Sequence, residues 1–377
     1  MTKLSLRFIT LTSVFALAGC GDDDFIYPPT TQPLTPAPDA GADAGDAGST
    51  PAEPADAALP EPEPTPDAGP SNATADAGDA AAPAAPTGSF AVGERPESAQ
   101  FDAVTNAWYV SVQGETDVPG DGYIAKLDAN ASAFITERFV TGLNEPKGIR
   151  VHDGRLFVAD VTELVIIDLA SAEVLSRTSI IGIGPNVPAE PFLNDVAVRA
   201  STGYVYVSDN RNNMIYRFEP DGSAPLLLLS DPNLEAPNGL LVDERDPDDP
   251  RLLVASLGPG FDPVLGTSEL PGAVLSLGII DLNDGDAQAA VSLISQRIGN
   301  LDGIEISGDD LLVSDVIGGR LLRVTPTTSS PPAVGEGNAQ VLRSGLSRGA
   351  DLGFDPARGL VLVPETTTGV VTSITLE

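Results

Sequence analysis

Six residues recur at one position of a repeated segment in this 377-residue chain, and their side chains could act together. In chain order they are Glu97, Lys147, Asn194, Asn238, Asp302 and Ala350. Four of them carry side-chain oxygens, two as carboxylates and two as amides. Such oxygens are the ligands of hard cations, and Ca²⁺ takes about 6–8 of them. The set therefore predicts a site for Ca²⁺ or another divalent cation, with water or a substrate completing the coordination.

Two metal-free interpretations stay open at this point. The Asn-Gly pair at Asn238 and the Asp-Gly pair at Asp302 are common in turns, which they favour without any ligand. Alternatively, Lys147 neutralises Glu97 or Asp302 as an ion pair. Turn chemistry explains each pair separately, but it does not explain why four oxygens share one position of the repeat.

The repeat itself indicates the fold. The six positions are separated by 50, 47, 44, 64 and 48 residues. Each opens a short apolar run that is followed by a second one, such as Leu156–Asp160 or Leu311–Asp315, with turn residues between the runs. A period of about 48 residues with four short strands per unit is typical of a β-propeller. We therefore expect an all-β fold, a six-bladed β-propeller over residues 89–377, whose six equivalent positions ring one mouth of the channel.

Closure of the propeller by an N-terminal strand is also predicted. The sixth unit ends after three strands, the last of them near Val370–Leu376, while Phe90–Val92 precedes the first unit. Phe90–Val92 can supply the missing outer strand, which joins both ends of the domain in one blade and removes an open edge. A split into five blades and one separate unit is the structural alternative.

Several residues outside the ring have expected roles as well. Asp160, Asp209 and Asp315 each end a second strand, where a carboxylate commonly caps a turn. Arg150 is expected to be a charge on a blade surface. Two long connections, 182–192 and 257–271, should rise over the metal face and cover a substrate.

The first 19 residues predict a secretory signal peptide. Lys3 and Arg7 precede an apolar stretch, Phe8–Ala18, that is too short to span a membrane. The stretch ends in Leu-Ala-Gly-Cys, which resembles the lipobox of bacterial lipoproteins. The resemblance implies cleavage before Cys20 and lipidation of its sulfur, hence a lipid anchor in the bacterial cell envelope, on the outer membrane or cell surface. An ordinary signal peptide with an incidental cysteine is the alternative.

Residues 20–88 predict a lipidated cysteine followed by a disordered linker. From Pro28 to Gly88 the chain consists mainly of Pro, Ala, Asp, Gly and Thr and holds no Lys or Arg. Such a segment buries too little apolar surface to fold. The linker is therefore expected to hold a monomeric propeller away from the membrane.

The charge and composition of the chain exclude several classes of partner and metal site. The formal net charge is −34, and the segment from Arg95 to the C-terminus carries 18 basic and 40 acidic residues. Nucleic acid is excluded as a partner, because phosphate binding depends on Lys and Arg. One Cys and one His exclude an internal disulfide and a zinc site built from those residues. The acidity instead favours attraction of cations to the channel.

The motifs around the ring resemble a known superfamily, that of the senescence marker protein, gluconolactonase and luciferin-regenerating enzyme, with paraoxonases as more distant relatives. The motifs are Pro-Glu-Ser at Glu97, Asn-Asp at Asn194, Asn-Gly-Leu at Asn238 and Asp-Gly at Asp302. The resemblance spans residues 89–377 and implies one divalent metal that serves the hydrolysis of lactones and some esters. By position, Glu97, Asn194, Asn238 and Asp302 would be its ligands, and Asp302 would also be the general base.

Two positions depart from the family pattern. Lys147 stands where paraoxonases place a His, and Ser98 stands where they place the Asp of a second calcium site. As an ammonium beside the metal, Lys147 would stabilise a developing oxyanion and count as catalytic. Alternatively, it repels the cation and marks a site without chemistry. The sequence thus leaves two functions open, a metal-dependent lactone or ester hydrolase and a non-catalytic surface propeller that binds a ligand or a protein.

Overall fold

The computed structural model describes residues 88–116, 118–188, 190–279, 290–329, 332 and 339–376. The predicted signal peptide, Cys20 and almost all of the predicted linker lie outside these residues. None of the helices in the described part of the chain is long and apolar enough to cross a membrane.

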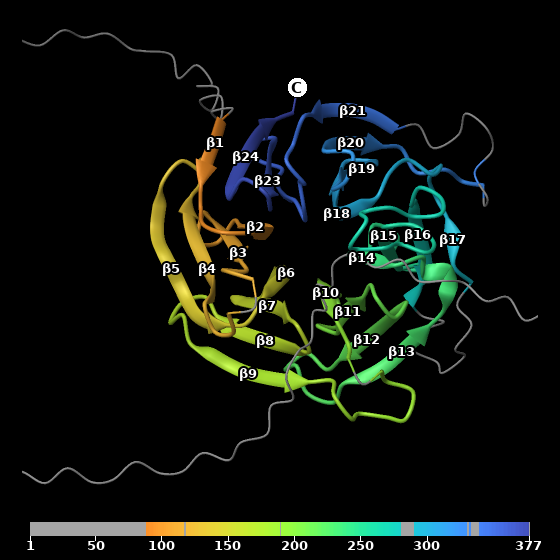
Figure 1. Cartoon of the computed structure of the whole chain (residues 1–377), viewed down its shortest axis with the longest axis horizontal. Coiled ribbons are helices and arrows are strands. Elements are labelled where there is room, and N and C mark those ends of the chain that lie inside the picture. The colour runs from red at the N-terminus through yellow and green to blue at the C-terminus, as the bar shows by residue number, and fades with distance from the viewer. Residues whose placement is uncertain are drawn as a thin grey trace, which may run out of the picture. The chain divides into compact units, whose positions relative to one another are not determined.

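Six four-stranded antiparallel sheets make up the described residues, and each sheet is one blade (Figure 1). The first blade contains β2 (Pro96–Asp102), β3 (Ala107–Val112), β4 (Gly122–Asp128) and β5 (Phe134–Leu143). The second contains β6 (Pro146–His152), β7 (Arg155–Asp160), β8 (Glu163–Asp168) and β9 (Val174–Ser179). The third contains β10 (Leu193–Val198), β11 (Val205–Asp209), β12 (Met214–Phe218) and β13 (Leu226–Ser230).

The remaining blades follow the same plan. A short 3₁₀ helix, η1 (Pro232–Leu234), precedes the fourth blade, which contains β14 (Pro237–Asp243), β15 (Arg251–Ser256), β16 (Val274–Gly278) and β17 (Ser292–Leu293). The fifth contains β18 (Leu301–Ser307), β19 (Asp310–Asp315), β20 (Arg320–Val324) and β21 (Ala339–Ser344). The sixth contains β22 (Gly353–Asp355), β23 (Leu360–Glu365), β24 (Val370–Thr375) and β1 (Gly88–Ala91). The six-bladed architecture predicted from the repeat is therefore confirmed.

The sixth blade combines both ends of the propeller, as predicted. Strand β1 pairs antiparallel with β24, with Phe90 opposite Val371. The Val92 amide continues the connection by donating to the Gly369 carbonyl at 3.0 Å. In Figure 1 the orange strand β1 lies beside the dark blue strand β24. This pairing covers the edge that β24 would otherwise expose.

The apolar core lies between neighbouring blades. One cluster joins Val92 and Trp108 to Leu360 and Val371, and so links the first blade to the sixth. Trp108 is fully buried, and its indole N–H donates to the Ala129 carbonyl at 3.1 Å, so the polar atom of this core residue has a partner. Because these clusters lie between blades, each blade buries its apolar side chains against its neighbours. The closed ring of blades therefore stabilises every blade.

Candidate metal centre

The structure brings the five polar ring residues together at the start of five innermost strands. Each is the second residue of its strand, in β2, β6, β10, β14 or β18, and Ala350 lies just before β22. They are Glu97, Lys147, Asn194, Asn238 and Asp302, with relative exposures between 3% and 7%. Charged and amide side chains are rarely so buried unless something pairs with them. The ring is therefore an enclosed polar site.

A β-bulge positions each ring residue. In β2, Pro96 pairs with Val112 and the next pair is Ala99 with Val110, so Glu97 and Ser98 together oppose one residue, Ser111. The same irregularity follows the first residue of β6, β10, β14 and β18. A bulge interrupts the alternation of side chains along a strand. Two consecutive residues can therefore both contribute polar groups to the channel, which the simple alternation of a strand does not predict.

A serine on the second strand holds each of several bulges in place. The Ser111 hydroxyl accepts from the Ser98 amide at 2.9 Å and donates to the Lys147 carbonyl of the next blade at 2.7 Å. Ser208 repeats this arrangement between the Asp195 amide and the Asn238 carbonyl. These hydroxyls satisfy backbone groups that the interrupted ladder leaves free. They also tie ring residues of adjacent blades to one another.

The glycines that follow ring residues are packing residues and not turn residues. Gly148, Gly239 and Gly303 lie inside β6, β14 and β18, and none of them is among the residues with positive φ. A Cβ on Gly239 would overlap the Asp302 carbonyl of the next blade. The turn interpretation of the Asn-Gly and Asp-Gly pairs is therefore wrong. These glycines instead allow neighbouring innermost strands to approach closely.

Two ring oxygens are buried without a hydrogen-bond partner. They are Glu97 Oε2 and Asn238 Oδ1. The Asn238 amide also hydrogen-bonds Asp302, which leaves its carbonyl oxygen free to bind another group. Unpaired buried oxygens are costly unless a donor or a cation satisfies them. The donor set of carboxylate and amide oxygens therefore fits a hard divalent cation.

The proposed metal ligands of the ring are a mixture of carboxylates and amides. No group of three or more His, Cys, Asp or Glu side chains is placed to hold a metal ion in the described ranges. The four predicted ligands include only two carboxylates, and Asn194 and Asn238 would supply the rest. Such a mixed set differs from a zinc site and is the kind of set that Ca²⁺ accepts.

Burial and nearby negative charges raise the pKa of both ring carboxyls. The pKa of Asp302 is raised to about 7, mainly by burial and then by the charge of Asp195, while Asn238 and Lys147 oppose the shift. The pKa of Glu97 is raised well above its usual range by burial and by Asp302, and Lys147 lowers it. Without a cation, both carboxyls therefore bind a proton more readily than exposed carboxyls do, and Asp302 is about half protonated near pH 7.

Lys147 belongs to the ring without forming a direct ion pair there. Its Nζ donates to Gln113 Oε1 at 3.0 Å and lies 4.8 Å from the centre of the Phe192 ring. The ion pairs of the described residues do not include one from Lys147 to Glu97 or Asp302. Burial lowers the pKa of Lys147, and the charge of Glu97 opposes that shift. Lys147 therefore attracts Glu97 over a longer distance instead of forming the direct ion pair of the metal-free alternative.

A second polar layer lies next to the ring, and the sequence interpretation missed it. The expectation that Arg150 is a surface charge is wrong, because its side chain is only 11% exposed and donates to Glu305 at 2.6 Å. Arg150 also donates to the Leu240 carbonyl, and the Leu240 amide donates to Asp195 at 2.6 Å. The Ser98 hydroxyl donates to Asp351.

The ring and the second layer together hold more acidic than basic side chains. The acidic residues are Glu97, Asp195, Asp302, Glu305 and Asp351, and the basic residues are Lys147 and Arg150. When all are ionised, three negative charges are uncompensated in a buried channel. A divalent cation or bound protons would offset most of this excess. The electrostatics therefore favour the same kind of ligand as the ring geometry.

The three second-strand aspartates cap connections, as predicted. Asp160 accepts from the backbone amides of Asn144 and Glu145, at 3.0 and 2.8 Å. Asp315 accepts from the Asn300 and Gly318 amides, each at 3.0 Å. Asp209 accepts from Asn212 at 3.1 Å in the same way. These carboxylates stabilise the loops on the ring face.

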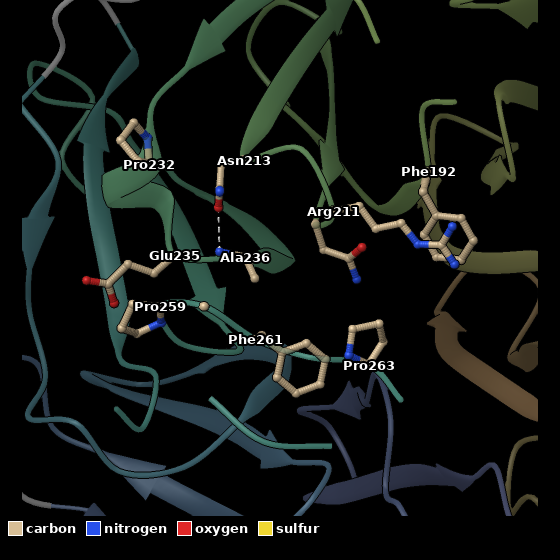
Figure 2. A pocket seen from close by; sticks show the side chains of 11 residues that line it. Phe192, Arg211, Asn213, Pro232, Glu235, Ala236, Pro259, Phe261 and Pro263 are labelled. Carbon is tan, nitrogen blue, oxygen red and sulfur yellow. Dashed lines mark hydrogen bonds between the residues drawn. The ribbon is translucent and has the colours of Figure 1, made fainter. Parts of the chain in front are cut away.

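The two long connections, which are expected to rise over the metal face, meet beside the ring. Phe192, from the first of them, and the segment Pro259–Pro263, from the second, line one pocket of about 640 Å³ (Figure 2). Phe192 contacts Lys147 as well, so the pocket adjoins the ring. A cavity of this size accommodates a small organic molecule. The ring thus has a neighbouring space that a substrate can occupy.

Comparisons with known proteins bear on the fold. No family model and no curated protein matches the chain. A gluconolactonase from Xanthomonas campestris is similar in structure, with a TM-score of 0.53, 15% identity, and coverage of 77% of this chain and 90% of that one. Hydrazine synthase from Kuenenia stuttgartiensis is also similar, with a TM-score of 0.51, 12% identity, and coverage of 75% and 96%.

A third similar structure is a protein of unknown function from Bacteroides thetaiotaomicron, with a TM-score of 0.50, 11% identity, and coverage of 78% of this chain and 73% of that one. At such identities the likeness is one of fold. It confirms the propeller that the superfamily resemblance predicted, and it leaves the activity to be argued from the site.

Proposed function

We propose that this propeller is a divalent-metal-dependent hydrolase of a lactone or an ester. The observation that carries the proposal is the buried ring in which Glu97 Oε2 and Asn238 Oδ1 lack partners. The similarity in fold to a gluconolactonase supports the same reaction class. The proposed ligands are the four oxygen-bearing side chains of the ring, Glu97, Asn194, Asn238 and Asp302.

A divalent cation, when bound, supplies a Lewis acid for the carbonyl group of the substrate. Asp302 has a pKa of about 7 in the free site, and a bound cation would lower it, which keeps the carboxylate in the ionised form that accepts a proton. In this proposal its carboxylate takes a proton from the attacking water. The same carboxylate is then the proton donor for the alcohol that leaves when the C–O bond breaks.

Lys147 is proposed to act as a hydrogen-bond donor. Its Nζ already donates to Gln113 and lies beside the pocket at Phe192. An ammonium at this position would stabilise negative charge that develops on the carbonyl oxygen. Gln113 also accepts from Arg95 at 2.7 Å, so the acceptor that orients Lys147 is itself held in place.

The predicted anchor completes the proposal. A lipid on Cys20 would hold the propeller at the bacterial cell envelope, with the Pro- and Ala-rich segment as a spacer. The substrate would then be a small molecule outside the cytoplasm. This part of the proposal rests on the lipobox-like segment before Cys20 and is independent of the propeller.

The direct test is hydrolysis of a panel of lactones and aryl esters by the purified full-length protein, with Ca²⁺ and after metal depletion. Activity should require the cation and should be lost in Asp302→Ala and Asn238→Ala. Matched controls are Asp248→Ala and Asn130→Ala, which alter exposed residues outside the ring. Hydrolysis that continues without metal, or in both ring variants, would refute the proposal. A rise in Tm with Ca²⁺ but no turnover of any substrate would favour the non-catalytic binding propeller.

A further inference from the structure

The pocket beside the ring has an apolar body. Its walls include Phe192, Phe261 and three prolines, Pro232, Pro259 and Pro263. They come from the segment before β10, from η1 and from the connection after β15, all on the face where the innermost strands begin. The volume of about 640 Å³ lies within the range of small-molecule sites. An aromatic or aliphatic group would bury apolar surface here.

The unpaired charge in this pocket is positive. The Arg211 guanidinium lies over the Phe192 ring, with Cζ 3.7 Å from the ring centre, and it makes no ion pair with any acidic side chain that the structure describes. The carboxylate of the pocket, Glu235, is already paired, because both of its oxygens accept from Arg297 at 2.6 Å. Figure 2 shows Arg211 on Phe192, with the Glu235 carboxylate on the opposite side of the pocket.

Asp209 lies beside the backbone of both stacked residues. Burial raises the pKa of its carboxyl, and the amides of Phe192 and Arg211 contribute to lowering it. Stacking on an aromatic face leaves the N–H groups of a guanidinium free for an anion in its own plane. Positioning before binding reduces the entropy that a ligand must lose. Arg211 is therefore the positively charged donor of a pocket whose other polar side chains are Asn210, Asn213 and Glu235.

Phe192 connects this donor to the ring. Lys147 Nζ lies 4.8 Å from the centre of the same aromatic ring that Arg211 covers. Phe192 is therefore a wall of the pocket and also a neighbour of the ring residue Lys147. Anion binding would then take place at Arg211, and the proposed hydrolysis at the ring.

We infer that this pocket binds an organic acid, a small molecule with a carboxylate for Arg211 and an aromatic or aliphatic body for Phe192 and Phe261. The inference deepens the proposed function and rests on it for the reaction. It narrows the substrate to a carboxylate-bearing lactone or ester. The propeller segment has 18 basic and 40 acidic residues, so general electrostatic attraction does not explain a preference for anions.

A binding experiment tests the inference without relying on turnover. Phenylacetate and its neutral analogue phenylacetamide are titrated into metal-depleted full-length protein, so that no cation at the ring can hold the carboxylate. The wild-type protein should bind phenylacetate about tenfold more tightly, since a charge-assisted hydrogen bond is lost with the amide. Arg211→Gln should abolish this preference, and Arg211→Lys should retain part of it.

Arg138→Gln is the matched control, because Arg138 also stacks on an aromatic ring, that of Tyr123 at 4.3 Å, but lies on β5 of the first blade. It should leave the preference unchanged. Equal binding of the two compounds, no binding of either, or a preference that survives Arg211→Gln would overturn the inference. Because turnover is not measured, the preference can hold while the hydrolase proposal fails, and the reverse outcome is equally distinguishable.

Discussion

The raised pKa of Asp302 predicts that the metal-free protein becomes less stable as the pH rises. In the folded state this pKa is about 7, against an ordinary value of 3.8. A group whose pKa is raised by folding stabilises the protein while it is protonated, and this contribution is lost as the pH rises through the folded value. The charged groups that face Asp302 are Glu97 on β2, Lys147 on β6 and Asp195 on β10.

The magnitude follows from proton linkage. Between pH 6 and pH 8 the unfolded carboxyl stays ionised, while the folded one goes from mostly protonated to mostly ionised. Asp302 alone then lowers the free energy of unfolding by about 1.4 kcal/mol over this range. Asp195, whose pKa is raised to about 6 mainly by burial, adds a smaller loss with the same sign. Bound Ca²⁺ reverses the trend, because cation binding requires ionised carboxylates.

The assay is urea unfolding at 25 °C of metal-depleted protein at pH 6 and pH 8, repeated with Ca²⁺. The wild-type protein should be more stable at pH 6 without metal, and Ca²⁺ should stabilise it more at pH 8. Asp302→Asn should reduce the pH dependence by about 1.4 kcal/mol, whereas Asp248→Asn, at an exposed position, should leave it in place. Higher stability at pH 8 in the metal-free protein would refute the electrostatic account of the ring.

Three further predictions concern other parts of the molecule. Arg150→Met should lower the free energy of unfolding by roughly 3–5 kcal/mol in urea melts, because it leaves buried carboxylates unpaired; an unchanged midpoint would contradict its place in the channel. Gly303→Ala should destabilise by about 1–3 kcal/mol, since a Cβ there would overlap Asp351, whereas Gly184→Ala meets open space and should have little effect. Cys20→Ser should move the protein from the membrane fraction to the soluble fraction of cells, and retention in the membrane would argue against lipidation.

The sequence predicted the parts of this structure that repeat. Alignment of the six repeats predicts that Glu97 and its equivalents lie at the start of successive innermost strands, because equivalent residues of the repeats occupy the same position in each blade. The short sixth unit likewise indicated closure, and the pairing of Phe90 with Val371 confirms it. Regular spacing carries this information because each blade has to bury the same faces against its neighbours.

The second layer and the pocket could not be predicted in this way. The β-bulges place residues such as Ser98 and Asp195 next to the ring, whereas simple alternation along a strand assigns them to the other face. The sequence does not connect Arg150 with its partner Glu305, which is 155 residues away in the chain, so its burial is not predicted. Arg211 and Phe192 lie in connections without periodicity, so only the folded structure shows that they stack. A recurring Val-Ser or Val-Ser-Asp at the ends of second strands, as at Ser111, was the one signal for the bulges that the sequence contained.

Calorimetric titration of Ca²⁺ into metal-depleted full-length protein at pH 8 tests the ring most directly. We expect one divalent cation per chain at the ring. Its affinity should fall by at least about 100-fold in Glu97→Gln and in Asn238→Ala, since mutation of residues that only orient metal ligands already lowers affinity by about 10–100-fold. Asn130→Ala should bind as the wild-type protein does. Absence of binding at millimolar Ca²⁺, or binding that both ring variants retain, would contradict the metal centre.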